Sequence, residues 1–205
     1  MANLIKLNIF PSLDAKTSQE VEIDVDSVYA IGPLKFQDGV YFLPINRKDD
    51  PAEKLICVPK SYFNQISGKE ESLFPTDKDG HILKGQSPVV IRLGNYVNSL
   101  GFNVIPFPLR SNLFVFKDIF VAPDKIRDIV PHFGGLINQE TKKAEESGSD
   151  FIFDGDFYFE GQKTSQIKTG MNKRAVLYKI NYVKSHRPKK VPVPAAAAQS
   201  SVGLT

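Results

Sequence analysis

The stretch that decides the fold class runs from Phe151 to Phe159 and reads FIFDGDFYF. An Asp-Gly pair between two apolar, alternating runs is a strong signal for a β-hairpin. With a three-residue loop at 154–156, Phe153 would face Phe157 and Phe151 would face Phe159. The stretch therefore predicts a hairpin that carries four Phe side chains on one face.

An aromatic hairpin face of this kind has two interpretations. It suits a platform on which bases of single-stranded nucleic acid stack, or cross-strand packing in a core or a subunit interface. The neighbouring carboxylates of Asp150, Asp154, Asp156 and Glu160 repel phosphate, which favours the packing interpretation. The candidate partner-binding residues of the stretch are Phe151, Phe153, Phe157 and Phe159.

Outward from this stretch, the alternation of apolar and polar residues typical of strands recurs along the chain. Further strands are expected at 4–9, 21–25, 40–43, 55–58, 89–91, 103–105, 113–116, 119–121 and 173–184. Helix is expected only as one or two turns at Lys60–Ile66 and Asp124–Val130, each directly after a proline. Fourteen Pro and 14 Gly supply the tight turns between short strands. We therefore expect an all-β fold, a sandwich or tandem small barrels with one or two short helices and an extended C-terminal arm.

Composition divides the chain into four expected regions. They are a β-rich body at 1–138, a flexible connector at 139–149, a hairpin and strand region at 150–184 that packs on the body, and a tail at 185–205. Two small modules, at about 1–70 and 71–138, are an alternative division of the body. Residues 25–33 and 123–131 do share Asp, β-branched residues, Ile and Pro at matching offsets. The match is short and has no fixed period, so coincidence is favoured over a true repeat.

Charge is distributed unevenly in this chain of 205 residues and net charge +3. No Asp or Glu occurs from Gly161 to Thr205, whereas nine of the 26 Lys and Arg residues do, which leaves residues 1–160 with 17 cations against 23 acids and a balance of −6. A mildly acidic body joined to a basic end indicates an interaction arm. Arg187, Lys189 and Lys190 lie in a Pro-rich tail with too little apolar surface to fold alone, and we predict that they contact a partner.

The sequence contains no recognisable catalytic or cofactor motif. Cys57 is the only cysteine, and three widely separated histidines do not have the spacing of a zinc site. We therefore expect no enzyme activity, no cofactor and no metal. The first residues lack the apolar run of a signal peptide, and no run has the ~20 apolar residues of a membrane helix. We expect a cytoplasmic origin, with a virion as one destination, and neither secretion nor a membrane.

Taken together, these features predict a non-enzymatic structural or assembly protein whose C-terminal arm contacts other subunits. The specific form expected is a virion component, such as a bacteriophage capsid, cement, neck or tail protein, in a homo- or hetero-oligomer. The alternative is a single-stranded nucleic-acid-binding protein of the oligonucleotide-binding-fold type, because the basic arm also suits nucleic acid.

Overall fold

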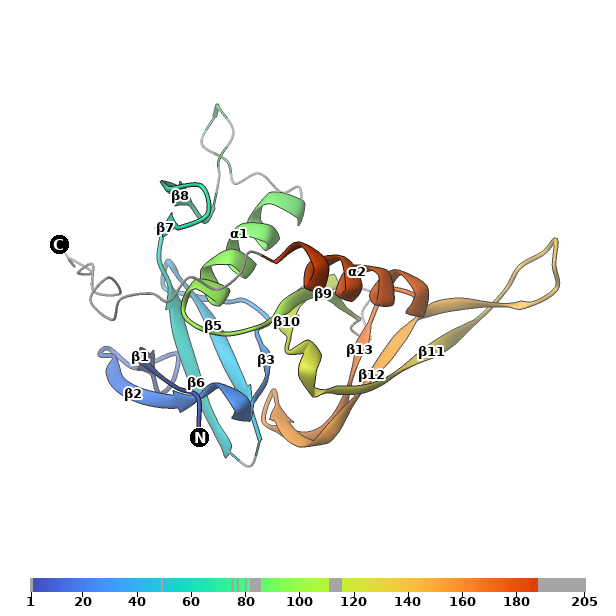
Figure 1. Ribbon diagram of the computed structural model, residues 1–205, viewed down its shortest axis with the longest axis horizontal. Helices are drawn as coiled ribbons and strands as arrows, with labels where there is room; N and C mark the ends of the chain where they lie inside the picture. The colour runs from blue at the N-terminus through green and yellow to red at the C-terminus, as the bar shows by residue number, and fades with distance from the viewer. Residues whose placement is uncertain are drawn as a thin grey trace.

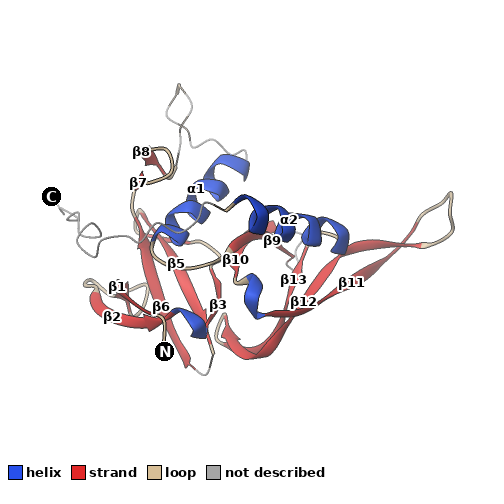
Figure 2. Cartoon of the chain, in the orientation of Figure 1, coloured by secondary structure: helices blue, strands red, loops and turns tan. Residues whose placement is uncertain are grey.

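The computed structural model describes residues 2–48, 50–74, 76, 78, 79, 81, 86–110 and 116–187. The strands are β1 (Leu4–Phe10), β2 (Gln19–Asp24), β3 (Val28–Ile31), β4 (Lys35–Gln37), β5 (Val40–Arg47), β6 (Asp50–Val58), β7 (Ser61–Asn64), β8 (Lys69–Ser72), β9 (Ile105–Arg110), β10 (Phe116–Val121), β11 (Ile126–Ile137), β12 (Ala144–Phe159) and β13 (Gln162–Thr169). The helices are α1 (Gln86–Ser99), α2 (Lys173–His186) and the short 3-10 helices η1 (Val25–Ser27) and η2 (Pro123–Lys125). Strands dominate, as Figure 2 shows, and the predicted all-β class is confirmed.

Eleven of the strands form one antiparallel sheet. Its path runs β11-β12-β13-β9-β10-β3-β5-β6-β1-β2, with β4 paired to β5 beside the path. The remaining described strands, β7 and β8, pair with each other. In Figure 1 the first half of the chain lies at one end of the molecule and the β11–β13 region at the other, with α1 and α2 on the same side.

The long sheet is built from two units of the same topology. The first unit, Leu4–Ser99, has the strand order β3-β5-β6-β1-β2, and η1 lies between its second and third strands in the chain. The second unit, Ile105–His186, has the order β11-β12-β13-β9-β10, and η2 lies at the corresponding point. A helix ends each unit, α1 in the first and α2 in the second. The five strands of each unit on the sheet path therefore match in order, whereas β4, β7 and β8 of the first unit have no counterpart among the described strands of the second.

The pairing registers match as well. A bulge separates Val28 from Ala30 in the β3–β5 ladder, and a bulge separates Ile126 from Asp128 in the β11–β12 ladder. These positions correspond when residues 25–33 are aligned with residues 123–131. The short sequence similarity therefore lies at the same structural position in both units. The shared strand order supports a true repeat, whereas the sequence alone favoured coincidence.

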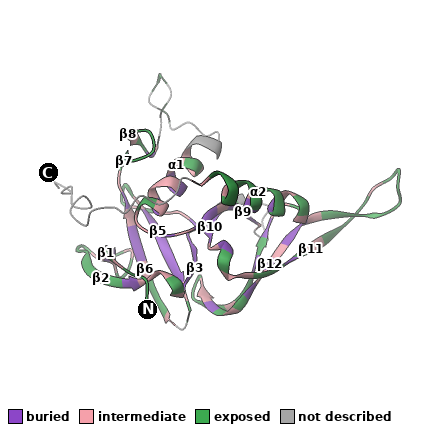
Figure 3. Ribbon diagram, viewed as in Figure 1, coloured by how far each residue is buried: buried purple, intermediate pink, exposed green. Residues whose placement is uncertain are grey.

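Each unit supplies most of one hydrophobic cluster, and the units meet at two strands, where Phe120 joins the first cluster and Tyr29 the second. The first cluster includes Leu43 and Val97, and the second includes Phe151 and Val176. Strand β10 pairs with β3, with Phe120 opposite Ile31 and Val121 opposite Ala30. All four residues of this junction are buried, and Figure 3 shows the buried residues concentrated along these central strands.

Several local predictions were wrong. The expected strand at 173–184 is helix α2, and the expected strand at 89–91 lies in α1. Residues expected to form a helical turn at 60–66 contain strand β7, and those at 124–130 contain the end of η2 and the start of β11. Of the strand expected at 113–116, residues 113–115 lie outside the described residues.

The predicted hairpin turn at 154–156 is also wrong. Strand β12 continues through this stretch to Phe159, and the chain reverses at Glu160 and Gly161, where Phe159 pairs with Gln162. Both turn residues have positive φ, 49° and 76°, as a tight two-residue hairpin turn requires. Residues 144–149 of the expected connector lie in β12, and residues 139–141 form the turn between β11 and β12.

Candidate interaction surfaces

The Phe residues singled out in the sequence lie in the core of the second unit. Phe151, Phe153 and Phe157 expose 0%, 1% and 0% of their surface, and Phe159 is half-buried against the same cluster. The Phe157 ring stacks on Tyr29 of β3 with 4.9 Å between ring centroids. A ring without exposed surface cannot stack on a base unless the core opens, so burial supports the packing interpretation of this stretch.

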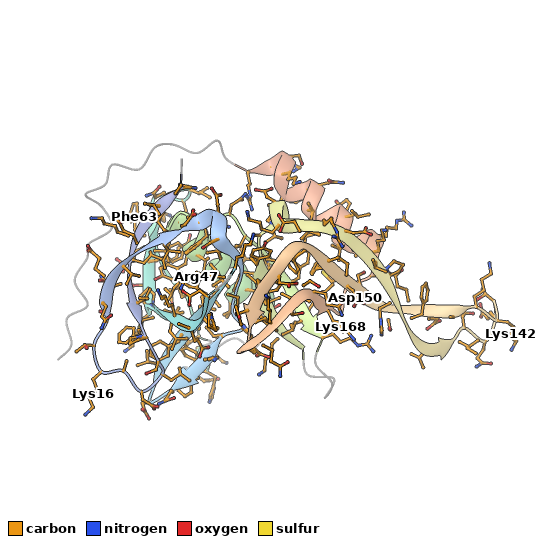
Figure 4. The ribbon with its side chains drawn as sticks, turned by 90° about the horizontal axis from the view of Figure 1, so that it is seen from below. Lys16, Arg47, Phe63, Lys142, Asp150 and Lys168 are labelled. Atoms are coloured by element: carbon orange, nitrogen blue, oxygen red, sulfur yellow. The ribbon has the colours of Figure 1, made fainter. Side chains whose placement is uncertain are left out.

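A surface that the sequence did not indicate is the outer part of the β11–β12 hairpin. From here on, the arm means residues 133–146, a different segment from the C-terminal arm expected from the sequence. All of these residues are exposed except Asn138, which is half-buried. Figure 1 shows the arm extending away from the rest of the molecule, and Figure 4 places Lys142 at its tip. Three large apolar side chains on the arm face solvent, Phe133 at 54%, Leu136 at 65% and Ile137 at 57%. Several large apolar side chains exposed on one projecting segment are typical of interaction sites.

The root of the arm is held firmly to the body. Arg110 of β9 donates from Nη1 to the Ser147 carbonyl at 3.0 Å and to its hydroxyl at 2.7 Å. The Ser147 hydroxyl in turn donates to the carbonyl of His132 on the opposite strand at 3.1 Å. Gly148 allows close approach to β13, because a Cβ there would lie 2.3 Å from the Thr169 carbonyl oxygen. The arm is therefore an exposed tip on a fixed base.

The turn at the tip also has defined geometry. The side-chain oxygen of Asn138 accepts hydrogen bonds from the backbone N–H groups of Glu140 and Thr141 at 2.9 and 2.8 Å. The Asn138 N–H donates to the Lys143 carbonyl at 2.9 Å. This Asx-type turn orders the residues between the two strands. The sequence signal for the arm was the pair Leu136-Ile137, isolated between Gly-Gly and a polar stretch.

A second exposed surface lies on α2. The helix begins at Asn172, whose side chain accepts from the Ala175 N–H at 2.8 Å, and it buries Val176 and Ile180 against the second cluster. Four other residues follow one another at intervals of four and therefore share one face of the helix. They form what we call the α2 stripe: Arg174, Tyr178, Tyr182 and His186, all exposed.

Aromatic rings stack along the α2 stripe. Tyr178 and Tyr182 are 71% and 51% exposed, and their rings lie 6.3 Å apart with 24° between planes. The rings of Tyr182 and His186 lie 4.0 Å apart with 16° between planes. The sequence placed Tyr178 and Tyr182 on one face of a strand; the spacing of four and the Asn172 cap were the signals for a helix.

Lys179 lies beside the stripe but points toward the body. Its ammonium sits 5.1 Å from the centroid of the Phe107 ring. Burial lowers the pKa of Lys179, and the charge of Asp118 on β10 partly opposes that shift. A pocket of about 560 Å³ opens here, lined by Met171, Asn172, Arg174, Ala175, Tyr178, Lys179 and Tyr182.

The basic residues predicted to contact a partner are only partly described. Arg187 folds back onto its own chain, where Nη2 donates to the Val104 carbonyl at 3.3 Å. Burial lowers its pKa, and the nearby Asp124 opposes the shift. Lys189 and Lys190, with the rest of the tail from residue 188, lie outside the described residues. The basic surface that the structure does describe is therefore on α2.

Within the described parts of the chain, no group of three or more His, Cys, Asp and Glu side chains is placed to hold a metal ion. None of the described helices is long and apolar enough to cross a membrane. Comparisons with known protein families, with curated proteins and with solved structures find no match for this chain.

Proposed function

We propose that this protein is a non-enzymatic structural protein that assembles with further copies of itself through the arm. The observation that carries the proposal is the exposure of Phe133, Leu136 and Ile137 on a hairpin that projects from the body. Keeping these side chains in water is unfavourable, at roughly 25 cal/mol for each Å² of apolar surface. A neighbouring subunit that covers them removes this cost.

The construction of the arm supports the same proposal. Its root is held by Arg110, Ser147 and Gly148, and its tip is ordered by the Asn138 turn. A preordered arm loses little conformational freedom when it docks, which leaves more of the contact energy for binding. An arm that reaches a different site on the next copy is a heterologous contact, which produces rings or filaments.

The setting that we propose for such an assembly is a virion, such as a bacteriophage capsid, neck or tail. Support for it comes from the β-rich body and from the arm. The C-terminal tail remains a second proposed contact through Lys189 and Lys190.

The test is the particle mass in solution of the full chain over a range of concentrations. We expect multiples of 22.9 kDa for the unaltered chain and 22.9 kDa alone for a variant with Phe133→Ser, Leu136→Ser and Ile137→Ser. Because these residues are exposed, the variant should keep its fold, which circular dichroism checks. The particle mass of a chain that ends at Arg187 shows how much the C-terminal tail contributes to assembly. A strictly monomeric unaltered chain would overturn the proposal.

A further inference from the structure

We propose that the α2 stripe binds single-stranded nucleic acid, with Tyr178 and Tyr182 stacking on bases and the neighbouring cations contacting phosphates. This site lies on a different surface from the arm, so it does not depend on the proposed self-assembly. It also differs from the aromatic platform predicted at 151–159, whose rings are buried.

The geometry of the rings suits stacking. Tyr178 is the most exposed aromatic residue on α2, at 71%, and lies next to Tyr182 along the helix axis. The His186 imidazole stacks on Tyr182 at 4.0 Å. Its Nδ1 lies 2.9 Å from the Tyr182 carbonyl oxygen, which accepts, and 2.8 Å from the Ser185 hydroxyl. These contacts hold the rings in a row before any ligand arrives. Solvent-exposed aromatic side chains are the usual stacking element of proteins that bind single strands without strong sequence preference.

Charge around the stripe favours a polyanion. Lys173, Arg174 and Lys184 are partly or fully exposed on α2, and Lys179 lies nearby over Phe107. No Asp or Glu occurs in the chain after Glu160. The acidic group closest to the helix start, Glu146, is engaged by the backbone N–H of Lys173. A helix with cations and no carboxylates gains from releasing the counterions of a phosphate backbone.

Unpaired strands fit this surface better than a duplex. The π-faces of bases in a duplex are covered by their neighbours, whereas those of a single strand can meet Tyr178 and Tyr182. The pocket beside the stripe, lined by Met171, Ala175 and the two Tyr rings, offers apolar surface to such a base. The ligand class is therefore single-stranded DNA or RNA, held by stacking and by backbone charge.

The test is fluorescence anisotropy of a labelled oligothymidylate, roughly 16 nucleotides long, titrated with the full chain at several salt concentrations. We expect Tyr178→Ala and Tyr182→Ala each to weaken binding roughly 10-fold, and Tyr178→Phe to keep it, because Phe retains the ring. Arg174→Gln should lower the slope of log affinity against log salt by roughly 0.7, the value for one released counterion on a single strand. The matched control is Leu177→Ala, an exposed apolar residue of α2 outside the stripe.

Three outcomes would overturn the proposal. They are no binding at low salt, binding that both Tyr→Ala variants leave unchanged, and equal or tighter binding to a duplex of the same length. If Tyr178→Ala changes the particle mass but not oligonucleotide binding, the stripe is a protein contact. The Ser substitutions at Phe133, Leu136 and Ile137 leave α2 unchanged. A failure of the self-assembly proposal can therefore be distinguished from a failure of the nucleic-acid proposal, which the Tyr variants test.

Discussion

The two units share a strand order, yet their outer edges differ from the strands that join them. At the junction, Phe120 of β10 and Ala30 of β3 are buried to 1% and 0% exposure. Aligning η1 with η2 places Glu22 of β2 where the second unit has Phe120, and Asp128 of β11 where the first has Ala30. Both carboxylates are exposed, and β2 and β11 are the two ends of the sheet path. At these two positions the side chains are apolar where the units join and charged where the sheet ends, whereas Val121 and Ile31 correspond to the apolar Ile23 and Ile129.

This difference gives a physical reason for a sheet of two units. A free edge strand presents unpaired N–H and C=O groups to any similar strand, and charged side chains are a common protection. If β11 met β2 of another copy as β3 meets β10, the carboxylates of Glu22 and Asp128 would have to be buried, and that costs free energy even for Glu22, which has Lys6 at 3.9 Å. The edges therefore end the sheet, and contact between copies is left to other surfaces such as the arm.

The largest effect on stability should come from placing the carboxylate of the outer edge at the junction between β10 and β3. Phe120→Glu removes a buried ring and places a carboxylate where β10 packs on β3, so we expect a loss on the order of 5 kcal/mol in the free energy of unfolding. Chemical denaturation followed by circular dichroism and tyrosine fluorescence measures it. The matched control, Glu22→Ala at the equivalent edge position, should change stability by no more than about 0.5 kcal/mol. Equal effects at the two positions would contradict the comparison.

The reciprocal change gives the edges the residues of the junction. In one variant Glu22→Phe makes β2 apolar, and in another Asp128→Ala removes the charge on β11. Each variant alters only one of the two strands that would meet. We therefore expect heterodimers, joined by β2 of one variant and β11 of the other, only when the two variants are mixed, and longer oligomers when one protein carries both changes. These changes are made in the protein that already carries Phe133→Ser, Leu136→Ser and Ile137→Ser, because those substitutions remove the contact proposed for the arm. Analytical ultracentrifugation measures the masses. Self-association of the Glu22→Phe variant alone would instead show non-specific adhesion.

Much of the fold could be predicted from the sequence, because strands with one buried face alternate visibly. Strands β1, β2, β5 and β6 lie where alternation or apolar runs placed them. Helix α2 was mistaken for a strand because Val176, Tyr178, Ile180 and Tyr182 fit a period of two. The same residues also fit spacings of four, with Val176 and Ile180 on the buried face, and tertiary packing decided between the two.

The candidate sites were less predictable than the fold. The arm depends on where β11 and β12 leave the body, and that is determined by long-range contacts such as Arg110 with Ser147. The aromatic stretch at 151–159 has the composition of a platform, but its burial results from packing on Tyr29 of the first unit. Neither contact has a local signature in the sequence. The internal repeat was visible only as one short similarity, because outside residues 25–33 and 123–131 the two units share strand order rather than residue identity.

A third prediction concerns a glycine that only the second unit requires. Gly148 has φ of 151°, and a Cβ there would lie 2.3 Å from the Thr169 carbonyl oxygen. The pair Ile31–Ile45 of the first unit corresponds to Ile129–Phe151 of the second, and counting back from it along β5 and β12 places Phe42 where the second unit has Gly148. Gly148→Ala should therefore lower the free energy of unfolding by roughly 2–4 kcal/mol, measured by urea denaturation. Gly161→Ala is the control for positive φ without a clash, since nothing lies within 4 Å of its Cβ position, and we expect about 1 kcal/mol. Similar losses for both would mean that steric contact at the arm root is unimportant.

The smallest expected effect concerns how α2 is held in the second unit. Its start depends on the Asn172 side chain, which accepts from the Ala175 N–H, and its buried side chains are Val176 and Ile180. Asn172→Ala should cost about 1 kcal/mol of unfolding free energy, whereas Asn172→Asp should retain the cap and favour the helix dipole. Thermal unfolding of the two variants gives the comparison. If α2 frays in the Ala variant, Tyr178 near its start should lose its stacking on Tyr182, and oligonucleotide affinity should fall more than global stability. An Asp variant as unstable as the Ala variant would show that the side-chain oxygen of Asn172 does not cap the helix.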